Sequence, residues 1–131
     1  RLSAPPETSR GEMFRMLRLV AIDDVVKKLN KGLDTVLSPL GLPLSPQETM
    51  RMKLAAALLG RPHILVLGEV FNLIDREVLE NVLRYLADHP ELTLVFFTQT
   101  NDLPYLDHDL TVGWDNQRIS RRETAQTLSA E

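Results

Sequence analysis

One stretch of the sequence, residues 44–75, constrains the fold more than any other part of the chain. It reads LSPQETMRMKLAAALLGRPHILVLGEVFNLID. An Ala- and Leu-rich helical segment is followed by a Gly-Arg-Pro break, a run of four apolar residues and a second helix start. A helix that leads into a buried strand and on to another helix is typical of an α/β fold, in which functional groups gather beyond the carboxyl ends of the strands.

The first helix of this stretch has a complete N-terminal capping signal. Ser45 is a good N-cap, Pro46 suits the first helical position, and Glu48 stands three residues after the cap. These residues predict a helix that runs to about Leu59 and ends at Gly60.

The apolar run that follows, Ile64 to Leu67, predicts a strand covered on both faces. Asp75 is expected to cap a helix over residues 76–88, and residues 92–98 predict a second strand. Strand, helix and strand in this order form a βαβ unit with parallel strands.

The flanking segments predict shorter elements. Ser9 and Glu12 have the spacing of a second capping box, so a helix is expected to begin there. The hydrophobic spacing and the turn residues further predict a helix from Asp23 to about Asn30, a loop over 33–43, and a hairpin of Leu110–Trp114 and Arg118–Ser120 around 115–117. The polar residues 121–131 are expected to form an exposed helix or a frayed tail.

Composition and charge exclude several kinds of site. A net charge of −3 and 5% aromatic residues argue against a nucleic-acid surface. The chain has no cysteine, and its histidines lack the spacing of metal ligands, so no metal site is expected. No apolar run reaches the roughly 20 residues that span a bilayer. Because the chain of 131 residues starts at Arg1 rather than Met, we expect it to be a piece of a longer polypeptide or a processed chain.

The same stretch resembles the second half of the ATPase domain of exporter-type ATP-binding cassette (ABC) transporters. That family has the signature LSGGQ, an Ala/Leu-rich helix, an apolar strand ending in Asp-Glu, and a loop ending in Leu-Asp. The resemblance runs from about Met13 to Ile119. Matching positions are Gly32, Leu33, Asp34, Thr35, Gly41, Leu44, Ser45, Arg51, Leu54, Ala55, Ala57, Leu58, Leu59, Pro62, Ile64, Leu65, Leu67, Glu69 and Asp75.

This resemblance implies an α/β fold, a partial P-loop NTPase core with parallel strands that is preceded by a helical subdomain. We expect the helical subdomain, with the signature-like helix, to occupy residues 1–62. The C-terminal portion of the α/β core is then expected over residues 63–131, with both parts in one compact unit.

The resemblance also implies a nucleotide site, and the sequence departs from the family within it. The signature serine is Ser45, but the glycines and the glutamine that follow it in the family are Pro46, Gln47 and Glu48 here. Proline has no N–H to offer a phosphate, and Glu48 adds negative charge where a phosphate would bind. A plain, well-capped helix is the alternative interpretation of these residues.

Other family positions follow the two strands. The family's magnesium-organising Asp is Gly68, and its general base corresponds to Glu69, which is either a residual catalytic group or an ordinary exposed carboxylate. Asp75 matches the D-loop residue that touches a partner domain, or is a simple N-cap. The switch His corresponds to Gln99, which can form a hydrogen bond but carries no positive charge.

No G-x-x-x-x-G-K-[ST] phosphate loop occurs in the 131 residues. We therefore expect no cofactor for this chain alone, and ATP with Mg²⁺ only if the parent protein is active.

Two functions remain open. In the first, the chain is a portion of an ABC exporter nucleotide-binding domain in a degenerate, pseudo-ATPase form. It would couple to membrane-spanning partner segments and pair with a second ATPase domain, as a homo- or heterodimer, on the cytoplasmic side of the membrane. In the second, it is part of an active transporter ATPase whose phosphate-binding loop lies upstream of residue 1. Neither function involves nucleic acid.

Overall fold

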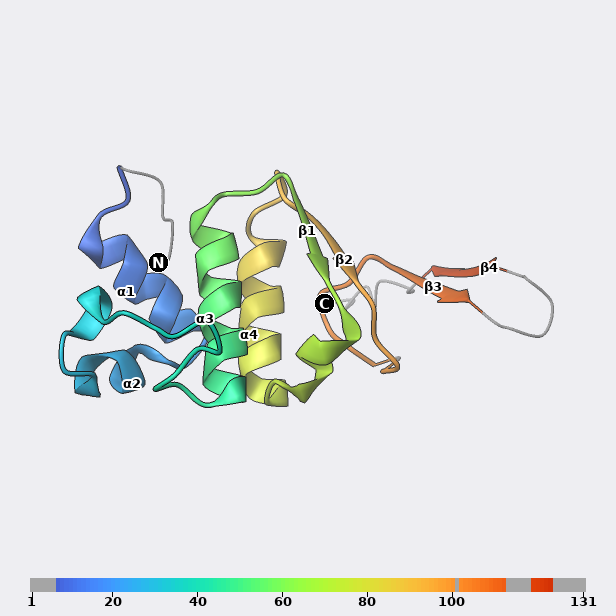
Figure 1. Ribbon diagram of the computed structural model, residues 1–131. Coiled ribbons are helices and arrows are strands. Elements are labelled where there is room, and N and C mark those ends of the chain that lie inside the picture. The colour runs from blue at the N-terminus through green and yellow to red at the C-terminus, as the bar shows by residue number, and fades with distance from the viewer. Residues whose placement is uncertain (1–6, 101, 113–118, 124–131) are drawn as a thin grey trace.

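The computed structural model describes residues 7–100, 102–112 and 119–123, and these form helices and strands in the expected α/β order. In Figure 1, α3 and α4 stand side by side, with α1 and α2 on one side of them and the strands on the other. The elements are α1 (Arg10–Leu19), α2 (Asp23–Lys28), η1 (Gly32–Asp34), α3 (Pro46–Leu59), β1 (Ile64–Leu67), η2 (Glu69–Leu73), α4 (Arg76–Ala87), β2 (Thr93–Phe96), β3 (His108–Val112) and β4 (Ile119–Glu123).

Both predicted capping boxes are confirmed. In α1 the Ser9 N–H donates to Glu12 Oε2 at 3.0 Å, and the Glu12 N–H donates to Ser9 Oγ at 3.2 Å. In α3 the Ser45 N–H donates to Glu48 Oε2 at 2.7 Å, and the Glu48 N–H donates to Ser45 Oγ at 3.2 Å. These reciprocal bonds satisfy backbone donors that the first helical turn would otherwise leave unpaired, so local sequence fixes where both helices begin.

The parallel βαβ unit is confirmed. β1 pairs with β2 in parallel, with Ile64 opposite Thr93 and Leu67 opposite Phe96, and α4 lies between the two strands in the sequence. β3 and β4 form the predicted antiparallel hairpin. Residues 121–123 belong to β4, so the predicted helix or tail is wrong there. The remainder of that segment, 124–131, and residues 113–118, which include the predicted turn at 115–117, lie outside the described residues.

One hydrophobic core joins the helices to a single face of the β1–β2 sheet. Leu65 and Leu67 of β1 point into this core, and α4 contributes every third or fourth residue, as an amphipathic helix does. The core consists of Leu17, Val20, Ile22, Val26, Leu44, Met52, Leu54, Ala55, Leu58, Leu65, Leu67, Ile74, Val78, Val82 and Leu86.

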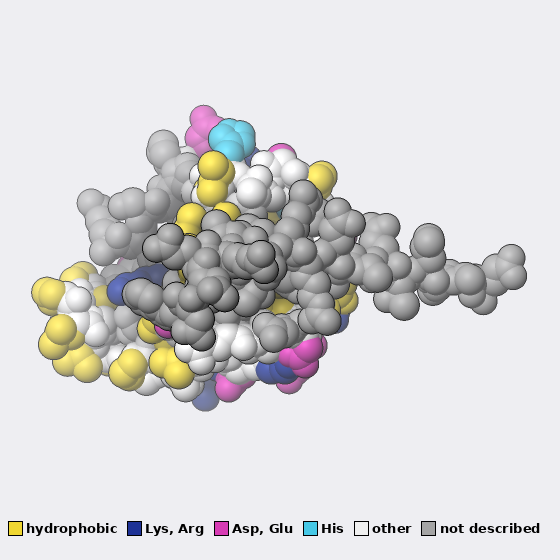
Figure 2. Space-filling model, turned by 90° about the vertical axis from the view of Figure 1, so that its right-hand side faces the viewer, with side chains coloured by type: hydrophobic (Ala, Val, Ile, Leu, Met, Phe, Trp, Pro, Cys, Tyr) yellow, Lys and Arg dark blue, Asp and Glu magenta, His cyan; other side chains and the backbone are white. Residues whose placement is uncertain are grey.

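The other face of the sheet corrects a sequence prediction. β1 is not covered on both faces: Ile64 is 65% exposed and Val66 57%, whereas Leu67 is 1% exposed. Val95 and Phe97 are exposed as well. Figure 2, which views the molecule from the strand side, shows hydrophobic side chains in several surface groups. The described part of the chain therefore packs helices against one sheet face and leaves apolar residues open on the other.

The described helices are all short. The longest of them, α3, has 14 residues, and no helix among residues 7–100 and the later described segments combines the length and the apolarity that crossing a bilayer requires.

Candidate functional site

The predicted site residues lie at one end of the molecule. In Figure 1 the N-terminus of α3, the η2 turn and the start of α4 all lie at the lower end. Ser45 precedes α3, Glu69 opens η2 directly after β1, and Asp75 precedes α4. The βαβ connection produces this arrangement, because β1 ends at the same edge of the sheet at which α4 begins.

The N-terminus of α3 is closed by its own side chains. Ser45 Oγ accepts the Glu48 N–H, and the Glu48 carboxylate accepts the Ser45 N–H. Pro46 occupies the first turn and has no N–H. A helix N-terminus binds anions through free backbone donors and a positive dipole end, and here a carboxylate of the chain already lies in that position.

The loop that follows β1 has an extended glycine and an exposed carboxylate. Gly68 has φ −77° and ψ 169°, and a Cβ added there would have no neighbouring atom within 4 Å. Glu69 is exposed. Across the described residues no group of three or more His, Asp or Glu side chains is placed to hold a metal ion. The geometry therefore leaves room for a Cβ at position 68.

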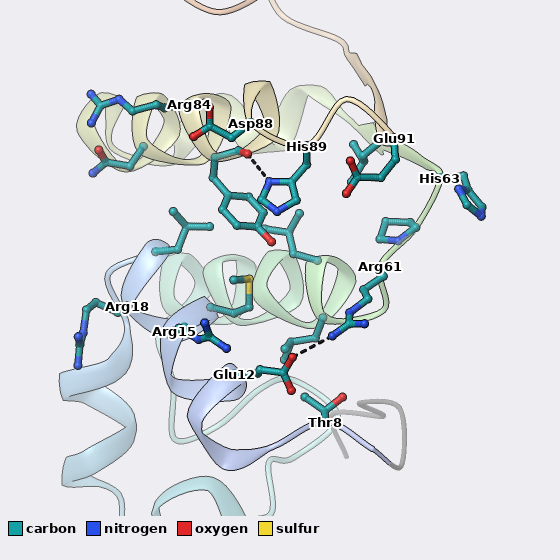
Figure 3. A pocket seen from close by; sticks show the side chains of 18 residues that line it. Thr8, Glu12, Arg15, Arg18, Arg61, His63, Arg84, Asp88, His89 and Glu91 are labelled. Atoms are coloured by element: carbon teal, nitrogen blue, oxygen red, sulfur yellow. Dashed lines mark hydrogen bonds and ion pairs between the residues drawn. The ribbon is translucent and has the colours of Figure 1, made fainter.

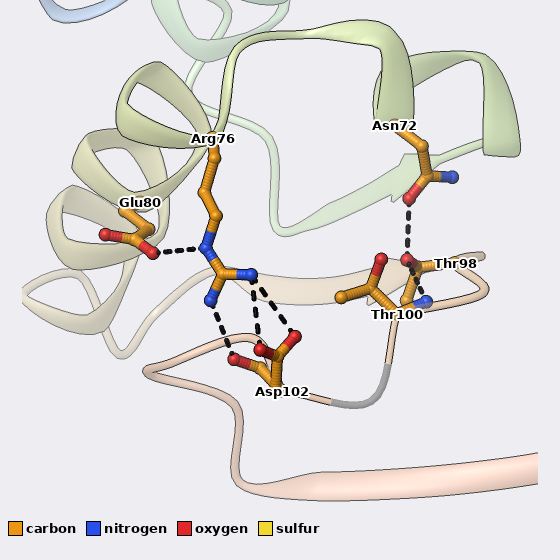
Figure 4. A network of polar contacts seen from close by, with 6 residues as sticks. All are labelled: Asn72, Arg76, Glu80, Thr98, Thr100 and Asp102. Carbon is orange, nitrogen blue, oxygen red and sulfur yellow. Dashed lines mark hydrogen bonds and ion pairs between the residues drawn. The ribbon is translucent and has the colours of Figure 1, made fainter.

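A hydrogen-bond network joins the loops that follow the two strands. Asn72 Nδ2 donates to the Glu69 carbonyl at 2.7 Å and to the Phe97 carbonyl at 3.3 Å, and Thr98 Oγ1 donates to Asn72 Oδ1 at 2.6 Å. Figure 4 shows the side chains of Asn72 and Thr98 pointing toward each other. Because Gln99 follows Thr98 directly, this network holds the predicted switch position close to the loop that carries Glu69.

Sequence reasoning missed this network, and it also missed the partners of Arg76. Arg76 Nε donates to Glu80 at 2.8 Å, and its guanidinium donates to both carboxylate oxygens of Asp102, at 3.2 and 3.3 Å (Figure 4). The Asp102 and Glu80 partners raise the pKa of Arg76, with the hydrogen bond to Glu80 as the larger cause. The sequence could have indicated the Arg76–Glu80 pair, because residues four apart on a helix are neighbours. The contacts between Arg76 and Asp102, which are 26 residues apart, have no signal in the local sequence.

The structure also corrects the prediction for Asp75. It stands at the N-cap of α4, as expected, but its side chain makes no capping hydrogen bond. The carboxylate instead forms an ion pair with Arg51 of α3. The position predicted to touch a partner domain is therefore engaged within the chain, while 66% of the Asp75 side chain stays exposed.

A charged groove lies at the other end of β1. It has a volume of about 1040 Å³ and is formed by α1, α3, α4 and the segment around His63. Figure 3 shows Arg61 paired with Glu12 at one rim, and the ring of His89 against the carbonyl oxygen of Tyr85. Because His63 precedes β1 and Glu69 follows it, this groove does not belong to the strand-end site.

Comparisons with known proteins point to one family. The chain is 36% identical over 91 residues to the glutathione/L-cysteine transport system ATP-binding/permease protein CydC of Haemophilus influenzae; the alignment covers 69% of this chain and 16% of that protein. It is 30% identical over 121 residues to the uncharacterized ABC transporter ATP-binding protein YfiB of Bacillus subtilis, across 92% of this chain and 21% of that protein. No protein-family model matches the chain.

The structural comparison agrees. A bacterial Atm1-family ABC exporter with ATP bound superposes with a TM-score of 0.68 at 25% sequence identity, over 83% of this chain and 19% of the exporter chain. The chain is homologous to part of the ABC exporters. It is also 27% identical over 117 residues to the mitochondrial iron-sulfur clusters transporter ABCB7 of Danio rerio, of which it spans 16%. This ABC exporter segment thus represents about a sixth of the length of the first curated relatives it matches.

Proposed function

We propose that this chain is a portion of an ABC exporter nucleotide-binding domain in a degenerate form, which keeps the packing of the ATPase and has lost its nucleotide chemistry. The observation that carries the proposal is the self-capped N-terminus of α3. Ser45 and Glu48 use each other as hydrogen-bond partners, at 2.7 and 3.2 Å, where the family's signature would present free donors to a phosphate.

Two other positions support the proposal, and each belongs to a different part of the chemistry. Gly68 stands where the family has the aspartate that organises magnesium, and Gln99 stands at the switch histidine. Gly68 offers no ligand, and Gln99 offers no positive charge. Glu69 keeps the position of the family's general base, but without metal and phosphate it has no reaction to catalyse.

The partners and the division of the chain follow from the same proposal. Residues 1–62 form the helical subdomain, which docks on membrane-spanning segments of a transporter, and residues 63–131 form the C-terminal portion of the core. A second ATPase domain contacts the region of Asp75, at the cytoplasmic side of the membrane. The relatives named ATP-binding/permease proteins support a membrane-spanning partner.

The retained Glu69 favours one alternative, in which the chain is part of an active ATPase. In that case the phosphate loop lies upstream of residue 1, a partner domain supplies a complete signature, and ATP and Mg²⁺ bind between the two domains. Hydrolysis would be slow, since the site containing Pro46 and Glu48 would contribute little to phosphate binding.

Two measurements separate these functions. For the 131-residue chain we expect no saturable heat in a calorimetric titration with Mg-ATP, and micromolar affinity would contradict the proposal. In the longer polypeptide, the degenerate form predicts that Glu69→Gln leaves phosphate release unchanged. Loss of a measurable hydrolysis rate in that variant would show that the alternative is correct. Glu91→Gln, at another exposed carboxylate, serves as the matched control.

A further inference from the structure

Arg51, in the second turn of α3, reaches two segments that are distant in the sequence. Its Nη2 pairs with the Asp75 carboxylate, and its Nη1 donates to the main-chain carbonyl of Ala21 at 3.4 Å. The Arg51 side chain is 14% exposed, whereas that of Asp75 is 66% exposed. One largely buried cation thus joins an exposed carboxylate to a backbone turn.

The two segments that Arg51 joins belong to different parts of the fold. Ala21 lies in the turn between α1 and α2, in a left-handed conformation with φ 54°. Asp75 lies at the N-cap of α4, directly after η2. Among the ion pairs formed between described residues, that of Arg51 and Asp75 alone connects the helices of residues 7–62 with the βαβ segment.

The guanidinium depends on both contacts. Arg51 Nε is buried and has no hydrogen-bond partner among the residues that the structure describes. A buried charge that loses one of its partners must recover hydrogen bonds from elsewhere, and it does so by moving or by admitting water. Either change disturbs the second contact as well, so the groups on the two sides of Arg51 are not energetically independent.

We propose that Arg51 couples the turn between α1 and α2 to the start of α4, so that a contact made at the exposed Asp75 carboxylate changes the stability of the turn at Ala21. A cation of a binding partner that takes Asp75 away from Arg51 leaves the guanidinium with the Ala21 carbonyl alone. The coupling is a property of this chain and goes beyond the proposed function, because it holds whether or not the chain handles a nucleotide.

Amide hydrogen exchange of the 131-residue chain tests the coupling. The variant Asp75→Asn removes the charge at a largely exposed position, so it is expected to fold. Its expected effect is an increase of about threefold or more in the exchange rates of the Ala21 and Ile22 amides, which donate to Arg18 and Leu17.

The matched control is Asp102→Asn. Asp102 is an exposed carboxylate that pairs with Arg76, the residue directly after Asp75, and it makes no contact with Arg51. In this control the Ala21 and Ile22 exchange rates should match those of the parent chain. If Asp75→Asn and Asp102→Asn give the same rates at Ala21, or if both leave them unchanged, the coupling does not exist.

A second variant separates the two arms of Arg51. Arg51→Lys keeps a positive charge for Asp75 but has a single ammonium group in place of the forked guanidinium, so it cannot span both acceptors in the same way. It should speed exchange at Ala21 and leave the amide of Leu79, which donates to the Asp75 carbonyl, close to its parent rate. Parent rates at both positions would contradict the proposal.

Discussion

The substitution Ser45→Ala tests whether the start of α3 serves as a cap or as a phosphate site. It removes the hydroxyl that accepts the Glu48 N–H at 3.2 Å and leaves the rest of the helix unchanged. Loss of a serine N-cap costs about 1 kcal/mol of stability, with a range of roughly 0.5–2 kcal/mol. That loss corresponds to a change of about fivefold in the unfolding equilibrium.

Equilibrium urea unfolding followed by far-ultraviolet circular dichroism measures this loss. With a urea dependence of about 2 kcal/mol per molar, the midpoint of Ser45→Ala should lie about 0.5 M below that of the parent. Ser9→Ala is the matched control, because α1 has the same box with bonds of 3.0 and 3.2 Å. We expect similar shifts for the two variants, since both hydroxyls accept one backbone donor in an exposed first turn.

Inorganic phosphate provides the contrasting condition. If Ser45 were held ready for an anion, phosphate would stabilise the parent chain more than Ser45→Ala, since a ligand that binds only the folded state raises its stability. We expect phosphate to shift the midpoints of both proteins equally. The reasoning is refuted if the urea midpoint of Ser45→Ala equals that of the parent while the midpoint of Ser9→Ala is lower. It is also refuted if phosphate stabilises the parent chain but not Ser45→Ala.

Three other experiments test the core, the strand-end loop and the response to pH. Leu54 is 1% exposed, and Leu54→Ala should lower the free energy of unfolding by about 2–5 kcal/mol. Leu40 is 84% exposed, and Leu40→Ala should change the free energy of unfolding by less than about 0.5 kcal/mol. Equal losses for the two variants in urea unfolding would contradict the described core. Gly68→Asp should keep the parent stability, because a Cβ at this position has no neighbouring atom within 4 Å. The variant should release no phosphate from Mg-ATP in a colorimetric assay, and sustained release would show that the missing aspartate alone had prevented activity. The Ser9 backbone N–H, more than any other group, holds the pKa of Glu12 below its usual range. The Glu12 carboxylate therefore stabilises the fold at pH values above its unfolded-state pKa. This stabilisation is lost as the pH falls through the folded-state pKa. Glu12→Gln should therefore flatten the acid side of the stability curve, and identical curves for variant and parent would count against this assignment.

Most of the features that the sequence predicted correctly are determined within a few residues. The Ser45–Glu48 spacing fixes the start of α3, because both partners of the capping box lie in one turn. The end of this helix at Gly60 and the parallel pairing of β1 with β2 were also readable, the first from a glycine and the second from the order strand, helix, strand.

The features that the sequence did not reveal depend on residues far apart in the chain. Asp75 has a capping position, but Arg51, 24 residues earlier, competes for its carboxylate, and no local spacing shows which partner prevails. The Asn72–Thr98 bond spans 26 residues in the same way. The exposed face of β1 has a different explanation. An apolar run shows that a strand can be buried on both faces, but it does not show which segment packs against the second face.

The open face of β1 and β2 has a consequence for work with this chain in solution. Ile64, Val66, Val95 and Phe97 place an apolar stripe in water beside strand backbone, a combination that invites neighbouring molecules to associate. Light scattering should therefore report a mean particle mass that rises with protein concentration, and replacing Val66 by lysine should suppress that rise.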